Sequence, residues 1–255
     1  MSKNSLSLFQ TSLGKKLLMA LSGLFLCTFL IVHLIGNMQL FKDDGGLAFN
    51  HYAKFMTTNP LIKIVSYANY ALILLHVFTS FSLTQKNKKA RPVNYGYNNP
   101  KANSIWSSRN MGILGTIILV FIVVHMQDFW WKYHNGPIPT QTYWEYQTPD
   151  GEAKSVFNAN EIPMESIATA HKAIYKDLYT EVATEFKAEI VLVLLYIIAQ
   201  IAIAFHLFHG FSSAFQTLGV NHKSYSPIIK LIGYGFAIIV PFLFATMPIY
   251  FHFIK

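Results

Sequence analysis

Histidine is the residue type in this sequence that could do chemistry from inside long apolar stretches. Four such stretches contain histidines well inside their ends: His33, His76, His125, and the pair His206 and His209. An ionisable side chain inside a membrane is costly, so it indicates a functional site. For a single histidine, a neutral imidazole that hydrogen-bonds between helices is about as good an explanation. The arrangement of the histidines favours the functional interpretation.

Counting residues along the stretches places the histidines in two layers. A helix rises about 1.5 Å per residue, and successive spans run in opposite directions. His33 and His125 lie 17 and 16 residues beyond the basic residues that precede their stretches, or roughly 25 Å of rise. His76 and His206 lie 10 and 13 residues before the expected inner ends of theirs, or roughly 15 to 20 Å. The sequence therefore predicts an outer pair, His33 with His125, and an inner pair, His76 with His206.

Two imidazoles without a nearby thiolate or carboxylate suit one kind of metal centre. A zinc site needs four nitrogen or sulfur ligands, or three ligands and a water. Two axial ligands are enough for a haem, because the porphyrin fills the other four positions of the iron. We therefore predict two haem groups of the b type, each held between two histidines.

A flat porphyrin also needs space beside its ligands. Slim side chains follow three of the histidines by four residues, on the same helix face: Asn37, Ser80 and Gly210. Phe129, four residues after His125, departs from this pattern. His209 remains an alternative inner ligand, because it differs from His206 by only about 4.5 Å in depth and about 60° around the helix. Gly210 favours His206.

The elements that position these histidines are five stretches free of Asp, Glu, Lys and Arg over much of their length. A bilayer takes about 20 apolar residues to cross, and the spans are expected at about 17–41, 64–85, 110–131, 190–219 and 231–254. Only 13% of the residues are charged, about half the usual share of a soluble domain. The expected fold is all-α, an integral membrane bundle of five transmembrane helices in a single domain over 1–255.

The basic residues predict the orientation of the bundle. The N-terminal segment and the second and fourth loops together contain 11 Lys or Arg and no acid, whereas all 12 acids lie in the other segments beside nine basic residues. By the positive-inside rule, the N-terminus is cytoplasmic and the C-terminus is outside. The basic residues form no stripe, so we expect no nucleic-acid partner. The outward-facing loop, about 133–189, is expected to be irregular in its middle. An amphipathic helix is expected from about Pro163 to Glu189.

Several segments match one known family: SLGKKLLMALSGLFLCTFLIVHLIGN (12–37), FNHYAKFM (49–56), HxxxS at 76–80, SRNMGILGTIILVFIVVHMQDFW (108–130), KDLY (176–179) and FHLFHGFSSAFQTLGVNH (205–222). With these segments the chain resembles the cytochrome b membrane anchor of succinate dehydrogenases and fumarate reductases, in the single-polypeptide, five-helix, di-haem form. The resemblance implies that helices one and three bind a distal haem, and helices two and four a proximal haem. This is the pairing that the depths predict.

The resemblance also implies partners. Succinate is oxidised, or fumarate reduced, on a flavoprotein subunit, and electrons pass through an iron–sulfur subunit docked on the cytoplasmic face. They then pass through the haems to or from a quinone, for which menaquinone is expected rather than ubiquinone. The chain itself would carry out no succinate chemistry. Its expected location is the bacterial cytoplasmic (inner) membrane among lipids, where the whole complex could form a dimer.

Two further groups of residues are candidates for binding. Haem propionates need cationic or hydrogen-bonding partners, for which the candidates are Arg109, Lys89 and Arg91. These residues are equally well explained as topology signals. A quinone needs a polar group for its carbonyl, and the candidates towards the outer end are Asn37, Gln39, His51 and Tyr52.

Two other functions remain open from the sequence. A di-haem cytochrome b that anchors a different dehydrogenase, such as a formate dehydrogenase or a hydrogenase, would have the same histidines. A transporter or channel with polar histidines would contain no haem. Some fumarate-reducing relatives carry a glutamate at the position of Ala204, so its absence favours the succinate-oxidising direction.

Overall fold

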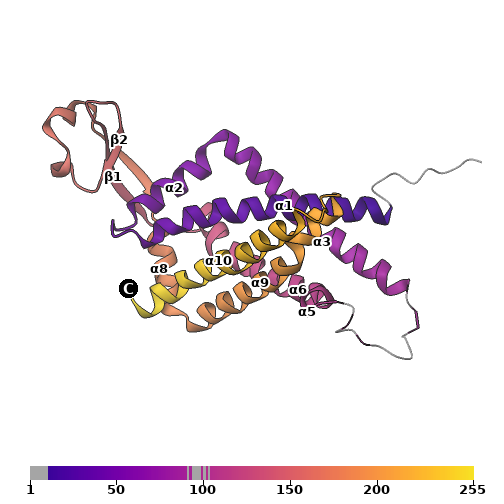
Figure 1. Ribbon diagram of the computed structural model, residues 1–255. Coiled ribbons are helices and arrows are strands. Elements are labelled where there is room, and N and C mark those ends of the chain that lie inside the picture. The colour runs from indigo at the N-terminus through magenta and orange to yellow at the C-terminus, as the bar shows by residue number, and fades with distance from the viewer. Residues whose placement is uncertain (1–10, 91, 94–98, 100–101, 103) are drawn as a thin grey trace, which may run out of the picture. The chain divides into compact units, whose positions relative to one another are not determined.

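The computed structural model describes residues 11–90, 92–93, 99, 102 and 104–255. Among these residues, five helices are long and apolar enough to cross a membrane. They are α1 (Ser12–Asn37), α3 (Pro60–Lys89), α6 (Met111–His125), α9 (Ile190–Thr217) and α10 (Ser226–Phe253) (Figure 1). The first continues into the 3-10 helix η2 (Met38–Phe41), and the third continues through the π-helix η3 (Met126–Trp131) into α7 (Lys132–Asn135). The prediction of five helices of membrane-spanning length is confirmed.

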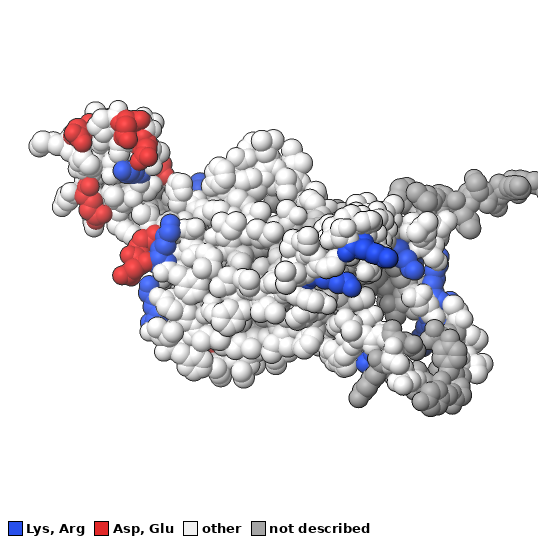
Figure 2. Space-filling model, in the orientation of Figure 1, with Lys and Arg blue, Asp and Glu red and all other residues white. Residues whose placement is uncertain are grey.

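The chain divides into two compact units. Unit 1 comprises Met1–Leu34, Ile64–Ile122 and Leu194–Thr246, and unit 2 comprises Ile35–Lys63, Val123–Val193 and Met247–Lys255. The sequence of unit 1 contains 11 Lys or Arg and no Asp or Glu, so all 12 acids belong to unit 2. Figure 2 shows acidic side chains gathered over the β-sheet of unit 2. The charge asymmetry of the sequence therefore coincides with the division into units.

Helix α9 is a central packing element of unit 1. Cys27 of α1, Leu207 of α9 and Ala237 of α10 form a buried apolar cluster. On α6, the ring of Phe121 lies edge-on to Tyr196 of α9, with centroids 4.8 Å apart. Small side chains such as Cys27 and Ala237 let helix backbones approach closely, as is usual between membrane-spanning helices.

Unit 2 contains a three-stranded antiparallel sheet in the order β2-β1-β3. Its strands are β1 (Thr140–Gln147), β2 (Ala153–Val156) and β3 (His171–Lys176), with the 3-10 turns η4 (Ala159–Glu161) and η5 (Met164–Thr169) between β2 and β3. Tyr143 and Tyr146 of β1 are buried, and Gly151, with φ +86°, lies in the turn to β2. The expectation of an irregular loop middle was therefore wrong, and the all-α prediction misses this sheet.

The amphipathic helix of the loop is shorter than predicted. It is α8 (Leu178–Ala188), whereas Ile167 and Ile174, which were expected within it, lie in η5 and β3. Asp177 sets its start, because the carboxylate accepts a hydrogen bond from the backbone N–H of Thr180 at 3.1 Å, a common N-cap arrangement. The predicted helix was wrong from Pro163 to Asp177, because pairing of β3 with β1 outweighs a helical spacing of apolar residues.

A buried asparagine joins three elements of unit 2. Asn50 lies on α2 (Leu47–Thr58), a helix that the sequence did not predict, and only 1% of its surface is exposed. Its amide nitrogen donates to Tyr143 Oη and to Asp177 Oδ1, each at 2.9 Å. Its oxygen accepts from the backbone N–H of Tyr179 at 2.9 Å. The segments 49–56 and 176–179, far apart in the sequence, therefore meet at this side chain.

Candidate functional site

The inner pair of histidines comes together within unit 1. His76 of α3 and His206 of α9 have ring centroids 6.3 Å apart, with their planes inclined by 61°. Since a metal lies about 2 Å from an imidazole nitrogen, two imidazoles on opposite sides of one metal have ring centres roughly 6 Å apart. The observed separation is therefore compatible with two axial ligands of one metal ion.

Helix α1 supports His76 from the side. Ser22 is 1% exposed, and its Oγ lies 3.0 Å from His76 Nδ1. Gly23 follows it, and a Cβ there would lie 3.4 Å from His76 Cε1. Larger side chains at Gly23 would press on the imidazole, so the glycine leaves room for the ring.

The surroundings of His206 on α9 differ from those of His76. Among the described residues, its buried Nδ1 has no hydrogen-bond partner, and leaving a buried polar atom unpaired costs about 1–3 kcal/mol. Gly210 is one turn later, where a Cβ would make only ordinary contacts, at 3.9 Å from the His206 ring and 4.0 Å from Met111. The nearby His209 is half-buried. In the described part of the chain, the ring contact with His76 is made by His206, while His209 stays an alternative ligand.

The donor set restricts which metal centre these residues could hold. Among the described residues, no group of three or more His, Cys, Asp or Glu side chains could hold a metal ion. Two imidazole nitrogens fit a metal whose remaining positions are filled by a macrocycle, as in a haem. The 6.3 Å separation of the two rings is compatible with that group, so the inner pair fits a bis-histidine haem.

The outer pair belongs to two different units. His33 of unit 1 lies against two aromatic rings: it stacks on Phe29 at 5.2 Å, and Phe244 of α10 is 5.5 Å away. His125 of unit 2 is the last residue of α6, with its ring 5.6 Å from Phe129. The pairing of His33 with His125 stays a prediction.

The sequence did not predict the π-helix that follows His125. Such helices are rare and occur frequently at functional sites. Inside η3 the backbone turn closes after five residues rather than four, so the rule of a slim side chain four residues after a ligand does not apply to Phe129. The segment from Met126 to Trp131, with sequence MQDFWW, is compatible with an α-helix as well, and no sequence signal separates the two.

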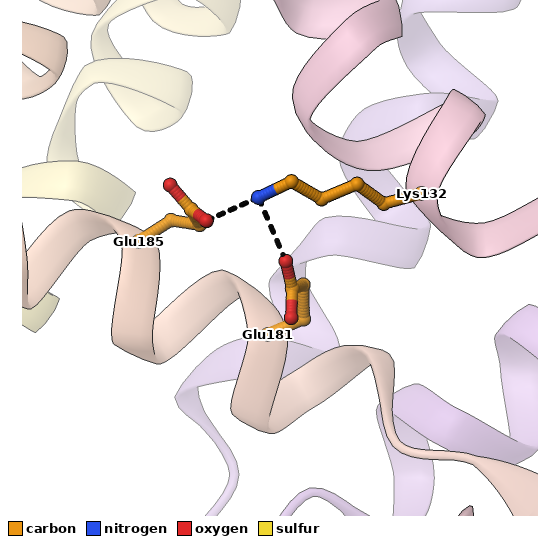
Figure 3. Close-up of polar contacts among 3 residues, drawn as sticks. All are labelled: Lys132, Glu181 and Glu185. Carbon is orange, nitrogen blue, oxygen red and sulfur yellow. Dashed lines mark hydrogen bonds and ion pairs between the residues drawn. The ribbon is translucent and has the colours of Figure 1, made fainter. Parts of the chain in front are cut away.

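Within unit 2, helix α8 contacts η3 and α7, which continue the third long helix. Lys132 Nζ lies 3.0 Å from Glu181 Oε1 and also pairs with Glu185, one turn further along α8 (Figure 3). Phe129 and Phe186 add a ring contact at 5.7 Å. The sequence analysis treated Glu181 and Glu185 only as charges of an outward loop, because it could not place them opposite Lys132.

Two of the candidate propionate ligands, Arg109 and Lys89, lie at the ends of helices in unit 1. Arg109 ends the short helix α5 (Trp106–Arg109), is exposed, and its guanidinium donates to the backbone carbonyl of Ser104. Lys89 ends α3 and is also exposed. Arg91 falls outside the described residues. Their role in binding a haem stays a prediction.

The candidate quinone residues all belong to unit 2: Asn37, Gln39, His51 and Tyr52. Tyr52 packs directly on α1, since a Cβ on Gly36 would overlap its ring, and burial raises the pKa of the Tyr52 phenol. Gln39 donates to the carbonyl of Ile35 at 3.5 Å. His51 is exposed and contacts Tyr175 of β3, with ring centroids 5.9 Å apart. The structure thus brings Tyr52 beside the end of α1, while His51 contacts the sheet.

Comparisons with models of protein families, with curated protein sequences and with solved structures find no match. A function for the chain must therefore be argued from its own residues and from the geometry of the histidine pair.

Proposed function

We propose that the chain is the membrane-anchor subunit of a succinate dehydrogenase or fumarate reductase, which passes electrons between an iron–sulfur subunit and a membrane quinone. The observation that carries the proposal is the approach of His76 and His206 from two membrane-spanning helices. These residues would hold the inner haem, and His33 and His125 the outer one. Each haem would supply a one-electron carrier that protein side chains cannot provide.

The protein's own contribution is to fix the ligands in a dry interior. His76 and His206 project from long helices rather than loops, so their separation is set by helix packing. Ligands on regular elements are held more accurately than ligands on loops. The buried cluster around Cys27, Leu207 and Ala237 provides apolar packing between α1, α9 and α10.

The charge distribution supports an orientation and a docking face. The loops that contain only basic residues would face the cytoplasm, with the N-terminus, and the C-terminus and the sheet would face outward. The flavoprotein and iron–sulfur subunits would dock on that cytoplasmic face of a bacterial inner membrane. Menaquinone is the proposed quinone, with Asn37 and Tyr52 among the candidate contacts.

Purification of the chain from its native membrane, with whatever subunits accompany it, tests the proposal. We expect two haems per chain in a dithionite-reduced minus oxidised spectrum, a flavin-bearing partner, and haem that succinate reduces. Haem that is reduced by formate or hydrogen but not by succinate would assign the chain to another dehydrogenase. A colourless protein would reject both assignments and favour a transporter or channel.

A further inference from the structure

The hydroxyl of Ser22 lies between its own helix and the imidazole of His76. Its Oγ is 2.7 Å from the carbonyl oxygen of Leu18 and 3.2 Å from that of Met19. It is also 3.0 Å from Nδ1 of His76, which lies on a different helix. A buried serine in a helix commonly donates back to the carbonyl four residues earlier, and 2.7 Å is the usual length of an O–H···O hydrogen bond.

The hydrogen-bonding capacity of each group determines which atom donates in these two contacts of Ser22 Oγ. A hydroxyl has a single hydrogen and two lone pairs, and a carbonyl oxygen can only accept. Because the hydrogen of Ser22 is directed to Leu18, its Oγ must accept from His76. The distance of 3.0 Å is typical of an N–H···O hydrogen bond. His76 therefore has its proton on Nδ1, which leaves the lone pair on Nε2 free to bind a metal.

We propose that Ser22 is the positioning residue of the inner haem site, which fixes the tautomer and the orientation of the His76 imidazole. The inference rests on the proposed function, since it assigns a role beside the inner haem. Metal-bound histidines almost always donate their second ring N–H to a partner, which also makes the ligand more basic. His206 Nδ1 has no such partner among the described residues, so His76 is the inner ligand whose orientation the protein's own side chains determine.

Removal of the hydroxyl has two expected effects. The affinity for the inner haem should fall about 10- to 100-fold, the usual cost of losing such a partner. The imidazole should also become a weaker donor, which destabilises the oxidised iron relative to the reduced iron. The midpoint potential of the inner haem should therefore rise, while the outer haem should not change.

Ser22→Ala tests the proposal, with Thr28→Ala as the matched control. Thr28 is also on α1 and donates to the carbonyl four residues earlier, Leu24, at 3.2 Å, but it is exposed. The purified complexes are titrated potentiometrically, and haem loss to an excess of a haem-scavenging apoprotein is followed. The outer haem of the same preparation reports whether the variant is folded.

We expect one haem component of Ser22→Ala to shift upward in potential and to be lost more readily, with the other unchanged. Identical behaviour of Ser22→Ala and Thr28→Ala would overturn the inference, as would an equal change in both haems. Failure of the proposed function is recognised separately, because the unsubstituted protein would then contain no haem, or haem that succinate does not reduce.

Discussion

Asn50→Ala should lower the free energy of local unfolding of unit 2 by more than the loss of one surface hydrogen bond would. The substitution removes three hydrogen bonds at once: two that the amide donates, to Tyr143 and Asp177, and one that it accepts from the backbone of Tyr179. Asn50 and Tyr143 are 1% and 0% exposed, so water cannot readily replace the asparagine. The three elements concerned are α2, β1 and the first turn of α8.

The magnitude follows from the partners that remain. Losing a hydrogen bond between neutral groups costs about 0.5–1.5 kcal/mol, and losing one to a charged group about 1.5–3 kcal/mol. Asp177 keeps two other hydrogen bonds, from the backbone N–H and the hydroxyl of Thr180, which places its contribution at the lower end. Together these terms give roughly 3–4 kcal/mol.

Amide hydrogen exchange of the purified protein in detergent measures this cost locally. Since every 1.4 kcal/mol is a factor of ten, protected amides of β1, β3 and α8 should exchange roughly a hundredfold to a thousandfold faster in Asn50→Ala. Asn158→Ala is the matched control, because its amide donates to Glu161 in an exposed position. An acceleration below about tenfold, or one equal to that of the control, would refute this account of the network.

Two further variants address the site and the end of α1. His206→Ala should leave one haem per chain in a pyridine haemochrome assay and His209→Ala should leave two, while the opposite result would make His209 the ligand. Gly36→Ala should force Tyr52 off α1 and cost about 1–3 kcal/mol, whereas Gly235→Ala, where a Cβ meets nothing within 4 Å, should change the thermal stability little. Equal melting temperatures for the two glycine variants would contradict the close packing of Tyr52.

The five long helices could be predicted from sequence because an apolar stretch of this length has few structural options. A backbone segment in lipid must satisfy its own hydrogen bonds, and a single stretch does so only as a helix. The ends were less predictable. Helix α3 was expected to end near 85 but continues to Lys89, since lysines are good helix formers and charged ends can lie outside the apolar layer.

The sheet of unit 2 was not predictable by the same reasoning. Strand β1 pairs with β3, so that Tyr143 lies opposite Ala173 across a connection of more than twenty residues. Pairing of this kind depends on contacts far apart in the sequence, which local periodicity does not report. The buried positions of Tyr143 and Asn50 became apparent only when their partners were in place.

For the candidate site, sequence reasoning predicted the elements better than the contacts. Depth along the spans placed His76 beside His206, because helical rise is nearly constant. The same arithmetic could not find Ser22, whose partner His76 lies 54 residues away on another helix. It also could not find the π-helix after His125, because the six residues of η3 carry no signal that distinguishes a π-turn from an α-turn.

Helices α3 and α9 of unit 1 contain buried polar atoms that lack hydrogen-bond partners. Within the described part of the chain, buried oxygens of Asn69 on α3 and Gln200 on α9 lack hydrogen-bond partners, as does Nδ1 of His206. Leaving a buried polar atom unpaired costs about 1–3 kcal/mol, so helices selected only for packing would not keep three of them. All three lie on the two helices that carry His76 and His206. Because amide oxygens only accept hydrogen bonds, a group that satisfied Asn69 and Gln200 would have to donate N–H or O–H; ionised haem propionates, which also only accept, would not satisfy them.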